Sequence, residues 1–536
     1  MRSAARASEA AKAGAAAGKA GAAAGKAARA REAAGNRAAV GAGKASGARG
    51  SAGARLSGWQ AELADVLDPG GVITDPTQLR TYECDGLTGF RVVPALVALP
   101  RTTEQVAQTV RVCARHGIPF VARGAGTGLS GGALPVADGI VISLQRMRDI
   151  IEVDLVNRRA TVQPGVTNLD ITRAAAPYGL YYAPDPSSQQ VCTIGGNVAE
   201  NSGGAHCLKY GFTVNHVLEA EVVLADGSVT RLGGGSPHQV GYDLLGAFIG
   251  SEGTLGIATE ITVRLLVRPA AVRTLVADFD SVEHASETVS AMVAAGIIPA
   301  AVEMMDNLAI QAVESATSCG YRREAAAALL IELDGPPEDV AEQFDQVRQL
   351  CQEHGATDVR LADDPESRQR AWRGRKAAFA AMGRISPNYF VQDGVVPRGR
   401  LAEALQRIAQ LSEQAGLRIA NVFHAGDGNL HPLVLYSEAR GEHERAERLA
   451  TAVAELCVEL GGSLSGEHGI GTDKACSMPR MFSQTDLDTM LRLRTAFDPA
   501  GLCNPGKIFP TPRLCGERPG PYRPHPLEAA GQIERW

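Results

Sequence analysis

Hydrophobic residues in the first half of the chain recur with the spacings of helices and strands. Thr102 and Gln105 have the spacing of a capping box, and apolar residues at 106, 110, 112 and 113 share one face. This pattern predicts a helix from Thr102 to His116 that Gly117 ends. The same criteria predict short helices and strands elsewhere: a helix over 60–67, strands over 118–122, 140–144, 151–153, 159–162 and 256–266, a helix from Thr167 or Asn168 to Tyr178, and a hairpin of 219–224 and 229–232 around Asp226-Gly227.

The second half of the sequence alternates strand and helix patterns. Strands are predicted over 274–279 and 327–333, and helices over 282–294 and 340–353. A final helix is predicted over 483–497. This order favours an α+β fold in which the second half contains an antiparallel sheet.

Composition narrows the class of protein. The 536 residues are 45% hydrophobic and 21% charged, values typical of a soluble globular protein with two or three domains. No run of about 18 apolar residues is present, so no transmembrane helix is expected. The net charge of −6 argues against a nucleic-acid partner. The ten cysteines form no C-x-x-C pair, which predicts reduced thiols in a cytoplasmic protein rather than an iron–sulfur or zinc site.

The first 55 residues differ from the rest. They consist almost entirely of Ala, Gly, Ser, Lys and Arg, with 11 basic residues and two acidic ones, Glu9 and Glu32. Because the segment has little to bury, we predict a disordered basic tail. No apolar stretch of a secretory signal follows the first arginines. Contact of this tail with an anionic membrane or nucleic acid is the alternative.

Three glycine-rich segments indicate a bound ligand. The first, 123–132, follows a predicted strand directly, and the others are 184–204 and 250–257. Backbone without Cβ atoms can present successive N–H groups to a pyrophosphate. Pro135 prevents the long helix that a Rossmann turn needs. Three such segments suggest one extended ligand, and flexible surface loops are the alternative.

Two histidines flank a predicted turn later in the chain. Asp427-Gly428 is typical of a two-residue hairpin loop. The register would then pair Gly426 with Asn429, Ala425 with Leu430, and His424 with His431. Opposed residues share a face with Cβ atoms roughly 4.5–5.5 Å apart, so the two imidazoles can bind one divalent metal. The alternative is two ordinary histidines, one exposed on each strand.

Glu467, next to His468 between glycines, can supply a third ligand. A site with two histidines and a glutamate leaves positions open for a substrate. Because adjacent residues of a strand face opposite ways, the glycines must let this segment bend if Glu467 and His468 serve one site. A solvated loop is the alternative.

The glycine-rich segments, above all RGAGTGLSGG at 123–132, resemble the FAD-binding domain of the vanillyl-alcohol oxidase / p-cresol methylhydroxylase family. The resemblance covers roughly residues 60–510. It is greatest to the branch with glycolate oxidase flavoprotein subunits, then to D-lactate and D-2-hydroxyglutarate dehydrogenases. It implies non-covalent FAD, because no histidine lies in 123–132. The residues implied to contact FAD are Arg123, Gly124, Ala125, Gly126, Thr127, Gly128, Asp185, Pro186, Ser187, Thr193, Gly195, Gly196, Asn197, Asn201, Gly203, Gly204, Gly253, Gly256, Ile257 and Asn504.

The same resemblance implies the roles of the other site residues. Positions matching His424, His431 and Glu467 hold a divalent metal, zinc or manganese, in the 2-hydroxy-acid dehydrogenase branch. The position matching His468 is the base, and the position matching Arg375 binds the substrate; a solvated basic helix face is the alternative for Arg375. Relatives that act on larger dicarboxylates carry a lysine near the position of Val391, so the apolar residue here argues for a smaller substrate.

The implied reaction is oxidation of a small 2-hydroxy acid, glycolate or D-lactate, to the 2-oxo acid. Hydride passes to flavin N5, and His468 accepts the hydroxyl proton. An external acceptor is then needed: a quinone, a cytochrome or an iron–sulfur subunit. Further oxidase subunits and a peripheral position at the inner face of the membrane are also implied. Two alternatives are a flavin-carrying, non-catalytic subunit of an oxidase complex and a metal-dependent hydrolase, which leaves the glycine-rich segments unexplained.

These expectations divide the chain into five parts. They are the basic tail 1–55, an FAD-binding domain 56–269, a substrate (cap) domain with the metal site 270–480, a segment 481–515 that returns to the FAD-binding domain, and a tail 516–536.

Overall fold

The computed structural model describes residues 58–235, 241–362 and 364–510. The predicted basic tail 1–55 and the predicted tail 516–536 lie outside these residues. Within them, none of the helices combines the length and the hydrophobicity needed to cross a membrane. Eight described cysteines are free thiols, and all of these except Cys84 are buried.

Residues 58–269, which fall in the predicted FAD-binding domain and are here called the flavin region, begin with a small, largely parallel sheet. Its strand order is β1-β2-β4-β3, and β2, β4 and β3 run parallel. Helices α2 (Gly58–Val66) and α4 (Thr103–His116) pack on it through a shared hydrophobic core. The strands are β1 (Val72–Ile73), β2 (Leu96–Ala98), β3 (Phe120–Arg123) and β4 (Ile140–Ser143). Because β3 ends at Arg123, the first glycine-rich segment starts at the carboxyl end of this sheet.

Helix α4 confirms the prediction from the sequence. Thr102 Oγ1 accepts the N–H of Gln105 at 3.2 Å, and Gly117 ends the helix with φ of 63°. The Gln105 side chain accepts from Arg101 N rather than from Thr102 N, so the cap closes one residue earlier than a regular capping box. The apolar residues Val106 and Val110 are fully buried.

An antiparallel sheet completes the flavin region. Its order is β5-β6-β10-β8-β9, and β8 and β9 form the predicted hairpin, with Gly227 at φ of 78° in the turn. Helix α5 (Asn168–Ala175) is capped by Thr167, as predicted, and a 3₁₀ turn continues to Tyr178. The strands are β5 (Ile150–Asp154), β6 (Arg159–Val162), β8 (Val217–Val223), β9 (Val229–Gly233) and β10 (Ile257–Arg264).

The second glycine-rich segment contains a helix that the sequence did not predict. Helix α6 spans Ile194–Glu200, and Thr193 Oγ1 accepts the N–H of Gly196 at its start. Gly195 and Gly196 in the first turn disfavour a helix by propensity. Packing decides instead, because Ile194 and Val198 are buried in the core of the antiparallel sheet.

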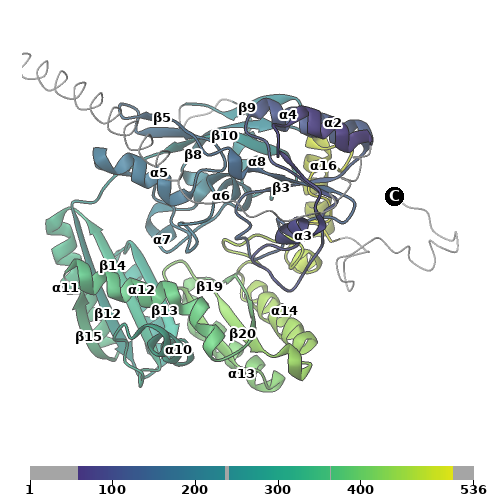
Figure 1. The fold of residues 1–536 in the computed structure, drawn as a ribbon. Helices are drawn as coiled ribbons and strands as arrows, with labels where there is room; N and C mark the ends of the chain where they lie inside the picture. The colour runs from purple at the N-terminus through teal and green to yellow at the C-terminus, as the bar shows by residue number, and fades with distance from the viewer. Residues whose placement is uncertain (1–57, 236–240, 363, 511–536) are drawn as a thin grey trace, which may run out of the picture. The chain divides into compact units, whose positions relative to one another are not determined.

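Residues 270–480, the predicted substrate domain and here called the cap region, are built on a nine-stranded antiparallel sheet, which confirms the predicted α+β class (Figure 1). Helices α9 (Val282–Ala294), α11 (Pro337–Glu353), α13 (Leu401–Ala415) and α14 (His443–Glu459) share one hydrophobic core with it. Helices α10 (Asn307–Thr317) and α12 (Pro365–Ala381) share a second core. The strands are β12 (Ala271–Phe279), β13 (Ala301–Asp306), β14 (Ala327–Gly335), β15 (Ala356–Ala362), β16 (Asn388–Val391), β17 (Gly394–Val395), β18 (Ile419–His424), β19 (Asn429–Leu430) and β20 (Pro432–Tyr436).

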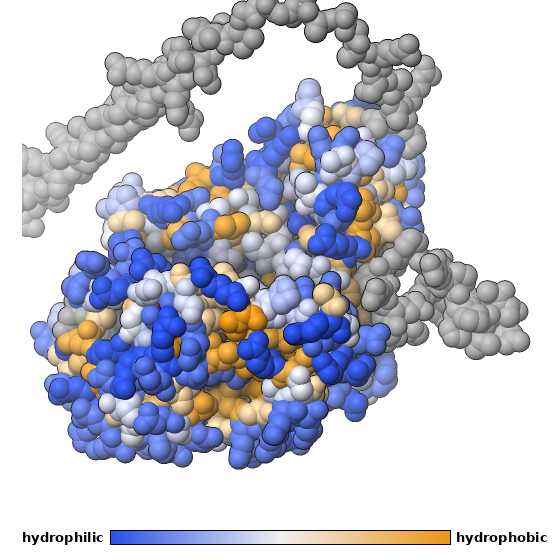
Figure 2. All heavy atoms as spheres, turned by 60° about the horizontal axis from the view of Figure 1, so that its bottom comes forward, coloured by the Kyte–Doolittle hydropathy of each residue, from blue (hydrophilic) through white to orange (hydrophobic). Residues whose placement is uncertain are grey.

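The face of the cap region that Figure 2 turns forward carries mainly hydrophilic side chains, with smaller hydrophobic areas between them. The last described helix, α16 (Gln484–Phe497), has the capping box of Ser483 and Asp486. The chain then returns to β3, where Phe120 N donates to Leu502 O and Asn504 N donates to Phe120 O. The end of the described chain therefore lies beside the first glycine-rich segment.

Candidate active site

One cavity joins the three glycine-rich segments to His468, the predicted base. It encloses about 380 Å³ and is lined by backbone and side chains from 122–133, 186–202 and 251–258. Phe379, Glu467 and His468 complete its wall, although they follow these segments by more than 100 residues in the sequence. The segments that would bind a flavin therefore face the same space as Glu467 and His468, whereas His424, His431 and Arg375 are not part of this wall.

The first segment offers unsatisfied backbone donors. Among the described residues, the N–H groups of Ala125, Gly126, Thr127 and Gly128 donate no hydrogen bond. Gly126 has φ of 72°, and the guanidinium of Arg123 fills the space that a Cβ there would need. Free N–H groups on such a loop fit the oxygens of a pyrophosphate. This segment therefore fits the phosphates of FAD.

Glycines let the first segment lie close to the second, and the third segment lie close to β8. A Cβ at Gly124 would overlap Thr193 Oγ1, the atom that caps helix α6. A Cβ at Gly256, which has φ of 137°, would lie 2.7 Å from Val223 O. These glycines thus shape the cavity as well as leaving room in it.

Most of the predicted cofactor residues line this cavity, and five do not. Those in the wall are Arg123, Gly124, Ala125, Gly126, Thr127, Gly128, Pro186, Ser187, Thr193, Gly195, Gly196, Asn197, Gly253, Gly256 and Ile257. Asp185 pairs with His206 Nδ1 at 2.9 Å, and a Cβ at Gly204 would meet Asp185. A Cβ at Gly203 would lie 2.8 Å from Glu467 Oε2.

The two asparagines outside the wall hold the surrounding backbone. Asn201 ends helix α6 in the left-handed region, with φ of 52°, and its Oδ1 accepts from Val214 N at 2.9 Å. Asn504 Nδ2 donates to Gly132 O at 2.7 Å and to Glu252 O at 2.6 Å. Asn504 thereby ties the returning C-terminal segment to the turns that line the cavity.

The register predicted for the histidine hairpin is wrong. His424 pairs with Asn429, not with His431, and the loop has four residues, Ala425 to Gly428. Other strands explain the wider loop: Gly426 N donates to Val302 O, and Val396 N donates to Gly428 O. The same register pairs Asn421 with Pro432, which places His431 opposite Val422. Because Val422 and His424 share a face, the two histidines are diagonal neighbours on it.

The two imidazoles nevertheless lie close together, and the Glu467 carboxylate contacts both. Their ring centroids lie 5.1 Å apart. The Nε2 atoms of His424 and His431 are each 3.3 Å from Glu467 Oε1, and the three residues are nearly buried. One ligand atom from each lies within 4.8 Å of the others. Two imidazole nitrogens and a carboxylate oxygen that converge in this way fit a zinc or manganese ion.

A carboxylate behind His424 orients its ring. His424 Nδ1 lies 2.6 Å from Glu303 Oε1, in hydrogen-bond contact. Donation from Nδ1 leaves the Nε2 lone pair directed at the cluster, which is the usual support of a metal-binding histidine. Burial opposes a charged His424, but Glu303 and Glu467 outweigh it and raise its pKa well above the usual value. A metal ion that binds His424 Nε2 would have to displace the proton that charges this imidazole.

Arg375 lies directly behind this pair. Its side chain is 5% exposed, and its NH2 atom is 2.6 Å from Glu303 Oε2. Within the described residues, the buried Nε atom of Arg375 has no hydrogen-bond partner. The solvated helix face considered for Arg375 is therefore wrong. Glu303 links the predicted substrate arginine to a predicted metal ligand.

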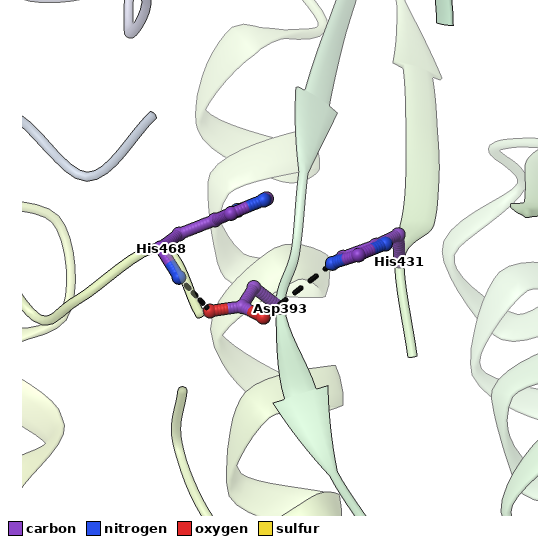
Figure 3. Close-up of side chains that lie close together, drawn as sticks. All are labelled: Asp393, His431 and His468. Carbon is purple, nitrogen blue, oxygen red and sulfur yellow. Dashed lines mark hydrogen bonds and ion pairs between the residues drawn. The ribbon is translucent and has the colours of Figure 1, made fainter. Parts of the chain in front are cut away.

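His468 stacks on His431 with ring centroids 4.8 Å apart and an interplanar angle of 4°. Its backbone N–H donates to Asp393 Oδ2 at 2.8 Å, and His431 Nε2 lies 3.5 Å from Asp393 Oδ1 (Figure 3). Burial lowers the pKa of His468 to about 4, against the opposing effect of Asp393. The imidazole is therefore neutral near pH 7, the protonation state that a general base needs.

Asp393, His431 and His468 form a second group that has the spacing of a metal site. Asp393 Oδ2, however, already accepts from Ser465 Oγ at 2.6 Å and from Gly466 N at 3.1 Å, in addition to His468 N. Its lone pairs are largely used, so we favour His424, His431 and Glu467 as the ligands. The bend that places Glu467 and His468 in one site follows from this anchoring by Asp393.

Glu303 and Asp393 were missed in the sequence. Each stands alone among residues that carry no motif, and only the strand register brings β13 beside His424 and the β16–β17 turn beside His431. A buried acid within a hydrophobic strand, as Glu303 is in β13, was the one available signal.

Comparison with known proteins also indicates FAD binding, as the cavity does. Residues 94–233 match the FAD binding domain family, and residues 268–508 match the C-terminal domain of FAD linked oxidases. The glycolate oxidase subunit GlcD of Escherichia coli (strain K12) is 53% identical over 441 residues, which cover 82% of this chain and 88% of that protein. A D-lactate dehydrogenase of Anaerostipes hadrus is 35% identical over 426 residues, covering 77% and 89%.

The fold is similar to that of p-cresol methylhydroxylase with substrate bound, with a TM-score of 0.71 and 18% identity over 84% of this chain and 95% of that one. The predicted p-cresol methylhydroxylase type of fold is thereby confirmed. The chain belongs to the FAD-linked oxidases, and it is a flavoprotein oxidoreductase.

Proposed function

We propose that this flavoprotein oxidises a small 2-hydroxy acid, glycolate or D-lactate, to the corresponding 2-oxo acid. The observation that carries the proposal is the shared cavity: its wall contains the phosphate-binding type of loop at 123–128 together with Glu467 and His468. The names of the glycolate oxidase subunit and the D-lactate dehydrogenase support the substrate class.

Two bound groups would supply chemistry that side chains lack. FAD would provide the ring that takes a hydride from the substrate Cα. A divalent cation, zinc or manganese, held by His424, His431 and Glu467 would provide Lewis acidity at the substrate hydroxyl.

The chain's own residues then handle the proton and the carboxylate. His468, neutral and in the cavity wall, accepts the hydroxyl proton on an imidazole nitrogen. Arg375 binds the substrate carboxylate through its partnerless Nε, and Glu303 holds the guanidinium in place. Burial of these groups excludes water and strengthens each charge interaction.

The proposed substrate size depends on the residue at the end of β16. Val391 at the end of β16 is apolar where larger dicarboxylates would need a cation. We therefore propose a substrate with one carboxylate rather than 2-hydroxyglutarate.

Electrons must leave the reduced flavin for a quinone, a cytochrome or an iron–sulfur subunit. The relative of 53% identity is named as a subunit, which supports further oxidase subunits around this chain. We propose that such an assembly places the protein at the inner face of the membrane.

A non-catalytic, flavin-carrying subunit is the second candidate, because that same relative is one subunit of an oxidase. It would have no need of the complete cluster of His424, His431, Glu467 and His468. Turnover by the isolated chain separates the two candidates.

Dye-linked turnover by the purified, FAD-loaded and metal-loaded chain tests the proposal. We expect activity with glycolate or D-lactate that exceeds activity with L-lactate and D-2-hydroxyglutarate. Equal inactivity with all four acids would reject the catalytic role and favour the subunit role.

A further inference from the structure

Residues 466–471, the catalytic segment, carry Glu467 and His468 but form no helix or strand. Each of the six N–H groups nevertheless donates to a side-chain oxygen. Gly466, Glu467 and His468 donate to Asp393 at 2.8–3.2 Å. Gly469 donates to Ser465 Oγ at 2.9 Å. Ile470 and Gly471 donate to Glu252 at 2.7 and 2.8 Å. Side-chain oxygens therefore accept the backbone N–H groups that carbonyl oxygens accept in a sheet or a helix.

The two carboxylates that hold the segment come from different regions. Asp393 lies between β16 and β17 of the cap region and is fully buried. Glu252 belongs to the third glycine-rich segment, lines the cavity and is 4% exposed. Glu252 thus ties the segment to the wall of the flavin cavity, while Asp393 ties it to the cap region.

The Glu252 carboxylate is itself rigidly placed. Its backbone has φ of 51°, a left-handed conformation that costs a non-glycine residue free energy. Two bonds hold that conformation: Glu252 N donates to Ala199 O at 2.8 Å, and Asn504 Nδ2 donates to Glu252 O at 2.6 Å. Helix α6 and the returning C-terminal segment therefore set the position of this side chain.

Glycine in the catalytic segment makes the contact possible. Gly469 has φ of 87°, and a Cβ there would lie 2.8 Å from Glu252 Oε1. A Cβ at Gly471 would overlap Ser130 O. Without side chains at these positions, the backbone approaches both the carboxylate and the first glycine-rich segment.

We propose that Glu252 is a positioning residue for the oxidation: by accepting the N–H groups of Ile470 and Gly471, it holds His468 at a fixed place in the wall of the flavin cavity. This inference rests on the proposed function, since it requires His468 to act on substrate. Glu252 is a cleaner test than Asp393, because Asp393 also lies 3.5 Å from His431 Nε2.

The test is Glu252→Gln in the full chain loaded with FAD and metal. The amide keeps one acceptor oxygen and turns an NH₂ group toward the other N–H, so one hydrogen bond is lost. A displacement of about 1 Å in a catalytic group costs on the order of 100-fold in rate. We expect flavin reduction by glycolate or D-lactate to slow by about 10- to 100-fold, with KM and FAD content within about twofold of the parent values.

Hydrogen exchange supplies a readout that does not depend on activity. The amides of Ile470 and Gly471 should exchange faster in Glu252→Gln, whereas the amides of helix α4 should keep their protection. Loosening that is confined to the catalytic segment distinguishes lost positioning from general destabilisation.

Asp75→Asn is the matched control. Asp75 also accepts two successive N–H groups, from Thr77 and Gln78 at 3.0 Å each, away from the catalytic segment and the cavity. This variant should reduce its flavin within about twofold of the parent rate.

The proposal is overturned if Glu252→Gln is reduced at the parent rate, if it loses FAD, or if it slows no more than Asp75→Asn. Failure of the parent protein to be reduced by any 2-hydroxy acid would instead reject the proposed function. In that case the exchange of Ile470 and Gly471 alone decides whether Glu252 holds the segment: faster exchange supports this, and unchanged exchange rejects it.

Discussion

The flavin cavity and the histidine cluster are built from the sequence in different ways. The cluster consists of His424, His431, Glu467 and His468. The cavity wall comes chiefly from three contiguous glycine-rich segments whose backbone faces the ligand. The cluster comes from the β18–β20 hairpin and the catalytic segment, and the acids that support it come from β13 and the β16–β17 turn. Backbone N–H groups need only the right loop shape, whereas side chains that bind a metal need neighbours to orient them.

This difference has a consequence for mutational sensitivity. Changes of the glycines in these segments should act on FAD affinity. Changes in the cluster, or in Glu252 that holds the catalytic segment, should act on turnover or metal affinity while FAD stays bound. A variant that crosses this division would break the comparison.

The largest effect is expected for His468→Ala. Removal of the base should lower turnover by about 10²- to 10⁴-fold, the range typical of general acid–base catalysis. FAD content should remain that of the parent, because His468 lies outside the three glycine-rich segments. Dye-linked assays and the flavin spectrum measure both quantities, and near-normal turnover would show that the base is misassigned.

A smaller effect is expected for Glu303→Gln, which removes the carboxylate behind His424. Metal affinity should fall by about 10- to 100-fold, as for other orienting partners of metal-binding histidines. Titration of metal into the metal-free variant measures this change. Glu314→Gln is the control: Glu314 is also buried in the cap region but accepts from Tyr321 N, away from the cluster. Equal metal affinity in both variants would contradict the role of Glu303.

Gly124→Ala tests the flavin side of the comparison. The new Cβ would push Thr193 Oγ1 from its cap on Gly196 N, and such overpacking costs about 1–3 kcal/mol. We expect weaker FAD binding in titrations of the apoprotein, with metal affinity unchanged. Gly234→Ala is the control, since a Cβ at Gly234 meets nothing within 4 Å. Unaltered FAD binding in Gly124→Ala would argue against close approach of these segments.

The smallest effect is expected for Thr102→Ala, which removes the cap of helix α4 outside both sites. The free energy of unfolding should fall by about 1 kcal/mol. Turnover and FAD content should not change. Denaturant unfolding measures the loss, and a change in kinetics without a loss of stability would be inconsistent with a purely local cap.

Local signals in the sequence predicted local structure well. The cap at Thr102, the end at Gly117 and the hairpin at Asp226-Gly227 depend on residues a few positions apart, and the structure confirms them. Helix α6 was missed because burial of Ile194 and Val198 overrides the low helix propensity of Gly195 and Gly196.

The same distinction between local signals and distant contacts applies to the candidate site. The glycine-rich segments could be recognised from the sequence, and most of the residues predicted there line the cavity. The predicted hairpin register was wrong because Gly426 N donates to Val302 O and Val396 N donates to Gly428 O, so these contacts widen the loop, which no local pattern reveals. The contacts of Glu303, Asp393 and Glu252 could not be predicted for the same reason: their partners lie far away in the sequence.

The central claim is that the glycine-lined cavity and the histidine cluster form one site for 2-hydroxy acids. The most direct measurement is anaerobic mixing of the FAD-loaded and metal-loaded protein with glycolate or D-lactate, following the absorbance of oxidised flavin. Rapid bleaching with at least one of these acids, and none with acetate or propionate, is the expected result. Persistent oxidised flavin with every small 2-hydroxy acid would contradict the account.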